Sequence, residues 1–329
     1  MQEYELKVLE QYPIDVKSTH KTRGAFFCET DKGLLLLKEA KGFRKKVPAI
    51  CKLHMHLREQ GIEMVDQFLP NKEGEYVSLL EDETPYVLKY WFRGRECDIR
   101  RSKEVMDGAK NLARLHTHMH IKLDEYIPQG IHIKEEYLRH NRELKKVRKF
   151  IRGQTGKGEF ELLFLKYFDE LYWWAEMALR ELEESQYERL YMESVNQDYL
   201  THGEYNYHNI LMTAEGMATT NFDRCKRNVQ AEDVYYYLRK AMEKHSWNIR
   251  MCDCILNAYC AIRPLSEEEI EYIKIRFLYP EKFWKITDSY YRSNKAWMPV
   301  KNIEKLKITI TQMEEKKQLL SKVFRSRIS

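Results

Sequence analysis

A short β-hairpin inside a long helical region is the feature that most constrains how this chain can fold. Residues 209–213 (NILMT) and 217–222 (MATTNF) are rich in apolar and β-branched residues and are joined by an Ala-Glu-Gly turn, a pattern that predicts two short paired strands. The polar segment 202–208 (HGEYNYH) precedes them, so polar residues at the strand ends meet at one edge. A hairpin has no architectural reason to interrupt helices unless it lines a cleft, and it therefore argues against a scaffold built of helices alone.

The N-terminal part of the chain predicts a β-sheet with one helix. Residues 24–30 (GAFFCET) and 33–40 (GLLLLKEA) flank an Asp-Lys-Gly turn, which is typical of a hairpin. The second strand is apolar up to Lys38, as a central strand of a sheet would be. Pro48 suits the first turn of a helix, and Gly61 can end that helix.

Two more predictions complete the N-terminal part. Residues 65–70 (VDQFLP) and 76–81 (YVSLLE) are expected to form a second hairpin around a turn at 71–75 (NKEGE). Residues 85–97 (PYVLKYWFRGREC) follow as a strand that breaks at Gly94.

From about residue 102 onward the pattern is largely helical. The helix expected over 103–119 carries the following residues along one stripe: Val105, Ala109, Leu112, Ala113 and His116. We interpret His116 as a packing residue rather than a metal ligand. A charged amphipathic segment covers 134–190, and the sequence GQTGKGE at 153–159 interrupts it as a surface loop.

The C-terminal part predicts further helices. Ser266 and Glu269 form the pattern of a capping box at a helix start, and residues 302–324 predict one charged amphipathic helix. The whole organisation is an α+β fold with a small sheet-rich lobe, 1–93, and a large, mostly helical lobe, 94–329, that carries the hairpin.

The composition excludes several classes of protein. Apolar residues make up 43% and charged residues 33% of the chain, as in an ordinary globular protein. The net charge of +5 is not gathered into the basic stripe that nucleic-acid binding needs. No apolar run approaches a membrane span, and the N-terminus lacks a signal-peptide core. We therefore expect cytoplasmic synthesis, no membrane or nucleic-acid partner, and reduced, mostly buried cysteines.

The polar residues around the hairpin resemble the catalytic segment of a kinase. Glu204 and Asn209 are five positions apart, the spacing of the Asp and Asn in the kinase catalytic loop, and His202 begins this loop. Asp223, or Asn221 beside it, occupies the place after the second strand where kinases have a metal-binding Asp.

Four passages carry a closer resemblance. They are WFRGRECD (91–98), HGEYNYHNIL (202–211), EDVYYYLRKAMEKHSW (232–247) and YPEKFWKITDSYYRSNKAW (279–297). Together they resemble the aminoglycoside-phosphotransferase-like kinases and, more narrowly, the spore coat protein S (CotS) family of endospore-forming bacteria. The resemblance spans nearly the whole chain.

This resemblance implies a bilobal kinase-like fold with a nucleotide-sized cleft, and ATP and Mg²⁺ as cofactors. Lys38 would point at the phosphates, Asp233 would brace the catalytic loop by hydrogen bonds, and His202 would be one of the catalytic residues. An adenine would lie against a hinge made of Lys89, Tyr90, Trp91 and Phe92. The resemblance alone also implies a spore-coat location and other coat proteins as partners.

The same resemblance implies a reaction at the loop. Glu204 would accept the proton of a small hydroxylated substrate, and the metal ions would be held by Asn209, Asn221 and Asp223.

The sequence departs from the kinase pattern at four places. Glu204 replaces an Asp and adds a methylene group, and Asn221 offers a neutral amide where a dication prefers a carboxylate. If residues 219–223 are extended, Asp223 lies on the same side as Asn221 and can partly substitute for it. The helix after Lys38 has no acidic residue between positions 43 and 58, and the nucleotide-covering loop HKTRGAF has one glycine.

Two hypotheses follow from these departures. In the first, the chain is a kinase-fold coat protein with a degenerate site, which has lost most or all phosphate transfer and acts as a binding or assembly component. In the second, it is an active ATP- and Mg²⁺-dependent phosphotransferase for a small molecule, with Glu204 as the base.

Overall fold

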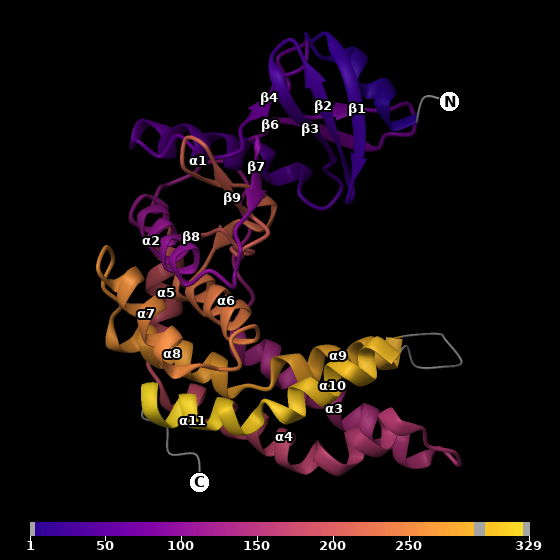
Figure 1. The fold of residues 1–329 in the computed structure, drawn as a ribbon, viewed down its shortest axis with the longest axis vertical. Coiled ribbons are helices and arrows are strands. Elements are labelled where there is room, and N and C mark those ends of the chain that lie inside the picture. The colour runs from indigo at the N-terminus through magenta and orange to yellow at the C-terminus, as the bar shows by residue number, and fades with distance from the viewer. Residues whose placement is uncertain (1–3, 293–299, 325–329) are drawn as a thin grey trace. The chain divides into compact units, whose positions relative to one another are not determined.

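The computed structural model describes residues 4–292 and 300–324 (Figure 1). Two compact units divide the chain. The first unit comprises Met1–Gln129, Ser194–Tyr237 and Ala258–Arg263, and the second comprises Gly130–Glu193, Leu238–Asn257 and Pro264–Ser329. The expected α+β class, with its sheet in the N-terminal part and helices through most of the remainder, is confirmed. The lobe boundary at residue 93 stays a prediction, and residues 293–297 of the passage 279–297 lie outside the described residues.

An antiparallel sheet forms the N-terminal part of the first unit. Its strands run in the order β1-β2-β3-β6-β4, and β5 also pairs with β6. The bounds are β1 Val16–Thr22, β2 Ala25–Thr30, β3 Gly33–Glu39, β4 Phe68–Leu69, β5 Ser78–Leu79 and β6 Pro85–Tyr90, after a 3-10 helix, η1, at Tyr4–Gln11. The predicted hairpin of β2 and β3 is confirmed, with Thr30 paired to Gly33 at its turn.

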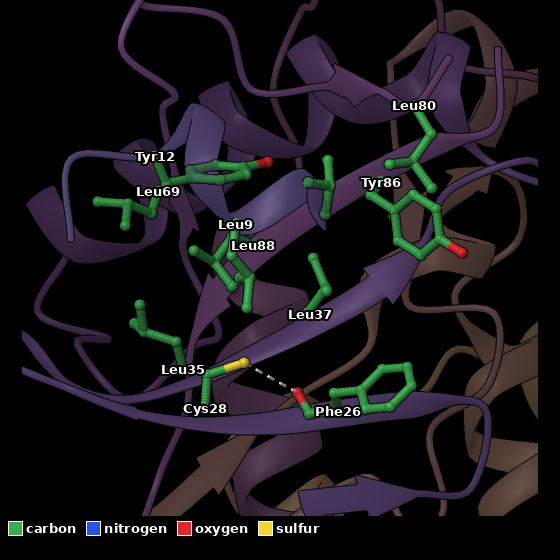
Figure 2. Packing of buried hydrophobic residues seen from close by; sticks show 11 residues of the cluster. Leu9, Tyr12, Phe26, Cys28, Leu35, Leu37, Leu69, Leu80, Tyr86 and Leu88 are labelled. Carbon is green, nitrogen blue, oxygen red and sulfur yellow. Dashed lines mark hydrogen bonds between the residues drawn. The ribbon is translucent and has the colours of Figure 1, made fainter. Parts of the chain in front are cut away.

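One face of this sheet carries the hydrophobic core of the unit. Figure 2 shows Leu35 and Leu37 from β3 close to Leu88 from β6, together with Leu9 from η1. Because side chains alternate between the two faces of a strand, Leu36 and Lys38 lie on the opposite face. The register pairs Leu36 with Lys89 and Lys38 with Val87, so both lysines lie on the face of the sheet opposite this core.

The second hairpin predicted in this region is wrong. β4 and β5 do not pair with each other but lie along the same edge of β6, with Phe68 opposite Lys89 and Ser78 opposite Tyr86. The connecting loop is held by Asn71, whose Oδ1 accepts hydrogen bonds from the backbone of Glu73 and Glu75. The backbone N–H of Asn71 also donates to Glu75 across the turn, but the strands on either side pair with β6 rather than with each other.

Two helices of the first unit confirm their sequence signals. Helix α1 (Val47–Glu59) has Pro48 in its first turn, and Gly61 follows its end with a positive φ of 80°. Helix α2 (Ser102–His118) buries its whole predicted stripe, including His116.

The predicted hairpin at the centre of the chain is also confirmed. Strands β9 (Ile210–Thr213) and β10 (Met217–Thr219) pair antiparallel, and β7 (Gly94–Glu96) pairs with β9. A methyl group on Gly94 would lie 2.5 Å from the carbonyl oxygen of Met212, so only glycine allows β7 to approach this closely. On the other side, Val65 forms a parallel bridge with Thr219 of β10. This bridge joins the hairpin to the segment that leads into β4.

The remaining elements near the hairpin are short. They are a 3-10 turn, η3, at Phe222–Arg224, and a two-stranded sheet of β8 (Leu200–Thr201) and β11 (Lys226–Arg227).

The second unit consists of helices. The helices lying wholly or partly in it are α3 Ile133–Gly153, α4 Glu159–Glu184, α5 Tyr187–Asn196, α6 Ala231–Met242, α7 Ile249–Cys260, α8 Glu267–Leu278, α9 Glu281–Arg292, α10 Val300–Thr311 and α11 Met313–Val323. The loop between α3 and α4 and the capping box of Ser266 and Glu269 are confirmed. Among the described residues, no helix is both long and apolar enough to span a membrane.

The single C-terminal helix predicted over 302–324 is wrong, because α10 and α11 are separated at Gln312. The run Ile308-Thr309-Ile310-Thr311 precedes the break, and β-branched residues are weak helix formers. Thr309 and Thr311 also donate hydrogen bonds back to the carbonyl oxygens of Lys305 and Ile308, which bends helices.

Candidate functional site

Four charged side chains from separate segments of the first unit contact one another near the end of the hairpin. They are Lys38, Asp66, Lys89 and Asp223. The Lys38 Nζ lies 2.6 Å from Asp223 Oδ2, and the Lys89 Nζ lies 2.8 Å from Asp223 Oδ1. Lys89 also donates to Asp66 Oδ2 at 3.0 Å. Asp223 is therefore shared between two ammonium groups, and Lys89 is shared between two carboxylates.

The local backbone explains how these groups come together. Lys38 and Lys89 lie on the same face of neighbouring strands, and Asp66 directly follows the bridge between Val65 and Thr219. Asp66 Oδ2 also accepts a hydrogen bond from the backbone N–H of Asn221.

The segment after β10 is not extended, which corrects the condition stated for Asp223. Asn221 is left-handed, with φ of 64° and ψ of 55°, and Phe222–Arg224 form a 3-10 turn. The two side chains still converge, because Lys38 Nζ donates to Asn221 Oδ1 at 3.1 Å as well as to Asp223. Asn tolerates this backbone region better than most residues. The turn therefore brings the side chains of Asn221 and Asp223 to the same ammonium group, although the segment is not extended.

Burial and charge act in opposite directions at these groups. The side chains of Lys89 and Asp66 are 0% exposed, whereas Lys38 is 28% and Asp223 13% exposed. Burial alone would raise the pKa of Asp223, but the ammonium groups of Lys89 and Lys38 outweigh it and hold this pKa well below its usual value. Burial alone would lower the pKa of Lys89, but Asp223 and Asp66 raise it above its usual value. Asp223 and Lys89 are thus charged at neutral pH.

Two of the three predicted metal ligands are hydrogen-bonded to each other, and one of them is hydrogen-bonded to the loop. Asn221 Nδ2 donates to Asn209 Oδ1 at 2.9 Å, and Asn209 Nδ2 donates to the backbone oxygen of Glu204 at 2.9 Å. No cluster of three or more His, Cys, Asp or Glu side chains suited to a metal ion occurs within the part of the chain that the structure describes. The role of Asn209, Asn221 and Asp223 as metal ligands stays a prediction.

The loop before the hairpin is fixed by Asp233, in the first turn of α6. Asp233 Oδ2 accepts from the backbone N–H of His202 at 2.6 Å, and Oδ1 accepts from that of Gly203 at 2.9 Å. His116 Nε2 lies 3.2 Å from Asp233 Oδ2, and its Nδ1 lies 2.7 Å from the hydroxyl of Tyr259. Burial opposes the ionisation of Asp233, yet these hydrogen bonds and the nearby histidines keep its pKa below the usual value.

His202 and Glu204 lie in the loop itself. The buried His202 ring contacts the carbonyl oxygen of Thr220 through Nε2 at 3.0 Å, and its Nδ1 accepts from the backbone N–H of Glu204 at 3.2 Å. The backbone oxygen of Glu204 also accepts from the side chain of Asn206. The backbone of Glu204 is thereby fixed, while its side chain is half-buried.

The four predicted hinge residues do not share one environment. Lys89 is turned into the charged cluster, whereas Tyr90 is exposed and Trp91 and Phe92 are half-buried. The backbone N–H of Tyr90 donates to Gln67, and that of Trp91 donates to Leu34. The predicted contact of this segment with adenine remains a prediction.

Three residues of the site were missed by sequence reasoning. Asp66 supplies the second carboxylate of the site, and it lies in the segment that joins the hairpin to β4. Lys46 donates to the carbonyl oxygens of Asp223 and Cys225, and burial lowers its pKa. His54 lies on the buried side of α1. Its place seven positions after Val47, on the apolar stripe of the helix, is the signal that could have revealed it.

His54 predicts a loss of stability in mild acid. Its ring packs on Phe68 and Phe222, neither ring nitrogen has a hydrogen-bond partner among the described residues, and burial lowers its pKa to about 4. Between its unfolded pKa of about 6.5 and about 4, only the unfolded chain binds this proton. Stability therefore falls as the pH drops through that window, by roughly 3 kcal/mol from this group.

Urea denaturation at pH 7.5 and 4.5 measures this effect. The variant His54→Phe is expected to lose less stability between the two pH values than the wild type, while His56→Phe, half-buried on the same helix, behaves as the wild type does. Equal losses in all three proteins would contradict the assignment to His54.

Comparison with known proteins gives consistent matches. The family model described as "Spore coat putative kinase YutH" matches residues 5–323. The chain is 26% identical over 345 aligned positions to Spore coat protein S of Bacillus subtilis (strain 168), with 96% of this chain and 93% of that protein covered.

Solved structures show the same fold. An aminoglycoside phosphotransferase from Alicyclobacillus acidocaldarius matches with a TM-score of 0.84 at 17% identity, covering 97% of this chain and 95% of that one. Spectinomycin phosphotransferase in complex with ADP and spectinomycin matches with a TM-score of 0.69 at 11% identity, covering 95% and 98%. The expected kinase-like fold of the aminoglycoside-phosphotransferase type is thereby confirmed.

Proposed function

Because the chain belongs to the family described as "Spore coat putative kinase YutH", we propose that it is a kinase-fold component of the bacterial spore coat with a degenerate phosphotransferase site. In this proposal the chain binds a nucleotide, transfers phosphate weakly or not at all, and acts in the coat as a binding or assembly component. The names of the family and of its relative, Spore coat protein S, support the coat role. The ADP bound to spectinomycin phosphotransferase, which has the same fold, supports the nucleotide.

The observation that carries the proposal is Asn221. This residue stands where a kinase holds a metal ion with a carboxylate, but its amide oxygen already accepts from Lys38 and its amide nitrogen donates to Asn209. A neutral amide is a weaker ligand than a carboxylate for a hard dication. Phosphate transfer depends on such dications to neutralise developing charge, so this site is poorly equipped for the transition state.

Glu204 weakens the site further. Its backbone is held by His202, Asn206 and Asn209, so the extra methylene group relative to Asp must displace the carboxylate from the position that an Asp would occupy. A displacement of about 1 Å can cost about a hundredfold in rate.

The same fixed backbone also supports a second candidate function. Because the loop is well anchored and Asp223 is ionised, the alternative is an active phosphotransferase for a small hydroxylated molecule, with Glu204 as the base. The two candidates differ in whether turnover depends on Glu204.

Turnover of the purified full chain tests the proposal. With ATP and Mg²⁺, we expect the release of γ-phosphate to water, and its transfer to a metabolite extract of sporulating cells, to be the same for the wild type and for Glu204→Ala. The double variant Glu204→Asp with Asn221→Asp restores the kinase residues at both positions, and we expect it to exceed the wild type.

Thermal unfolding provides the control for this experiment, because Glu204 is only half-buried and its replacement should leave the unfolding midpoint within a degree or so of the wild type. Substrate-dependent turnover by the wild type that disappears in folded Glu204→Ala would instead establish the second candidate.

A further inference from the structure

We propose that Lys89 is a built-in counter-cation for Asp223, which allows this site to hold the polyphosphate of a nucleotide without a divalent metal ion. The inference rests on the proposed function, since it concerns the ligand that the same site would take. It differs from the hinge role that the sequence predicted for Lys89, because it depends on the side chain rather than on the backbone.

The position of Lys89 is fixed by its surroundings. Its ammonium group is 0% exposed and contacts one oxygen of Asp66 and one of Asp223, at 3.0 and 2.8 Å. The rings of Phe68 and Phe43 lie 4.8 and 5.4 Å from it, so aromatic faces and carboxylates surround it together. A lysine confined in this way cannot swing out to meet a ligand, and its charge acts on Asp223.

The oxygens expected to bind a metal ion are already engaged. Asp223 Oδ1 accepts from Lys89 and Oδ2 from Lys38, while Asn221 Oδ1 accepts from Lys38 and Asn209 Oδ1 accepts from Asn221. A dication at this place would lie next to two ammonium groups. The donor set, as it is arranged, therefore does not fit a divalent metal ion.

The charges explain how phosphate could bind instead. Two basic side chains, Lys38 and Lys89, lie against two acidic ones, Asp66 and Asp223, so that their formal charges balance. Lys38 is the more exposed lysine, at 28% against 0% for Lys89. An incoming phosphate can therefore bind the Lys38 ammonium group in place of Asp223. Asp223 then remains neutralised by Lys89, and the repulsion between carboxylate and phosphate that a dication normally removes is already reduced.

Isothermal titration of the full chain with ATP tests this inference, in buffer with EDTA and in buffer with MgCl₂. For the wild type we expect dissociation constants that agree within about threefold between the two buffers. The double variant Lys89→Met with Asp66→Asn removes the counter-cation and its buried partner together. In this variant ATP should bind at least about tenfold more weakly in EDTA than in MgCl₂, a difference of about 1.4 kcal/mol.

Two controls make the result specific. Lys41→Met removes an exposed lysine close to β3 and should behave as the wild type does. Adenosine has no phosphate, so its affinity should be the same for the wild type and the double variant, and an equal loss for adenosine and ATP would overturn the inference.

Two further outcomes would overturn it. Wild-type binding that requires MgCl₂ would show that a metal ion enters the site despite Lys89, and it would leave the proposed function intact. Absence of ATP binding in both buffers would make Lys89 a purely structural residue and would also remove the nucleotide from the proposed function, but not its degenerate phosphotransferase site. The proposed function fails on a different result, turnover that depends on Glu204, so the two failures are distinguishable.

Discussion

Replacement of Asp233 with alanine is expected to lower the free energy of unfolding by about 3–5 kcal/mol, the range seen when one partner of a buried charged network is removed. The carboxylate is buried and accepts from the backbone N–H groups of both His202 and Gly203. Without it, both donors lose their acceptor, and each such loss at a buried group costs about 1–3 kcal/mol. Since a domain is stable by only about 5–15 kcal/mol, this change should also loosen the loop that carries Glu204.

Urea denaturation followed by circular dichroism measures the loss, and Glu215→Ala serves as the matched control. Glu215 is an exposed carboxylate at the tip of the neighbouring hairpin, so its removal should change stability by less than about 0.5 kcal/mol. If Asp233→Ala proved as stable as Glu215→Ala, the hydrogen bonds to the loop would not matter for folding.

Much of the fold could be predicted from the sequence because its signals are local. The alternation and turns of residues 24–39 and 210–219 specify their hairpins, and the stripe through Val105 and His116 specifies the buried face of α2. The same alternation placed Lys38 at the end of a buried strand. Such signals depend on residues a few positions apart, and residues that are this close in the sequence are also close in the fold.

The partners within the site could not be predicted in this way. The helix after Lys38 has no acidic residue between positions 43 and 58, yet Lys38 has an acidic partner, Asp223, 185 positions away in the chain. Asp66 appeared as an ordinary strand residue, and Lys89 was predicted only as part of the hinge for adenine. The position of β4 and β5 in the sheet is also set by β6, a strand farther along the chain with which both of them pair. Pairing over such distances is set by tertiary packing rather than by local propensity.

Lys89→Met is expected to be among the most destabilising changes in the first unit. Methionine fills a similar volume among the aromatic rings, but it leaves Asp66 buried and without its ammonium partner. Breaking a buried pair from one side costs about 3–5 kcal/mol. The expected result is a lower urea midpoint with little change in the slope of the transition, because the denatured chain exposes much the same surface.

Adding Asp66→Asn to Lys89→Met should recover stability rather than lose more. The asparagine Oδ1 can still accept the backbone N–H of Asn221, as Asp66 Oδ2 does, and the uncompensated buried charge disappears. Because neutral replacement of both partners of a buried ion pair is often close to neutral in stability, we expect the double variant to regain at least about half of the loss. Additive losses in the two single variants and the double variant would mean that Lys89 and Asp66 act independently. A pair that can be exchanged for neutral groups at little cost in stability would be retained for another reason, and the charge that Lys89 places beside Asp223 supplies one.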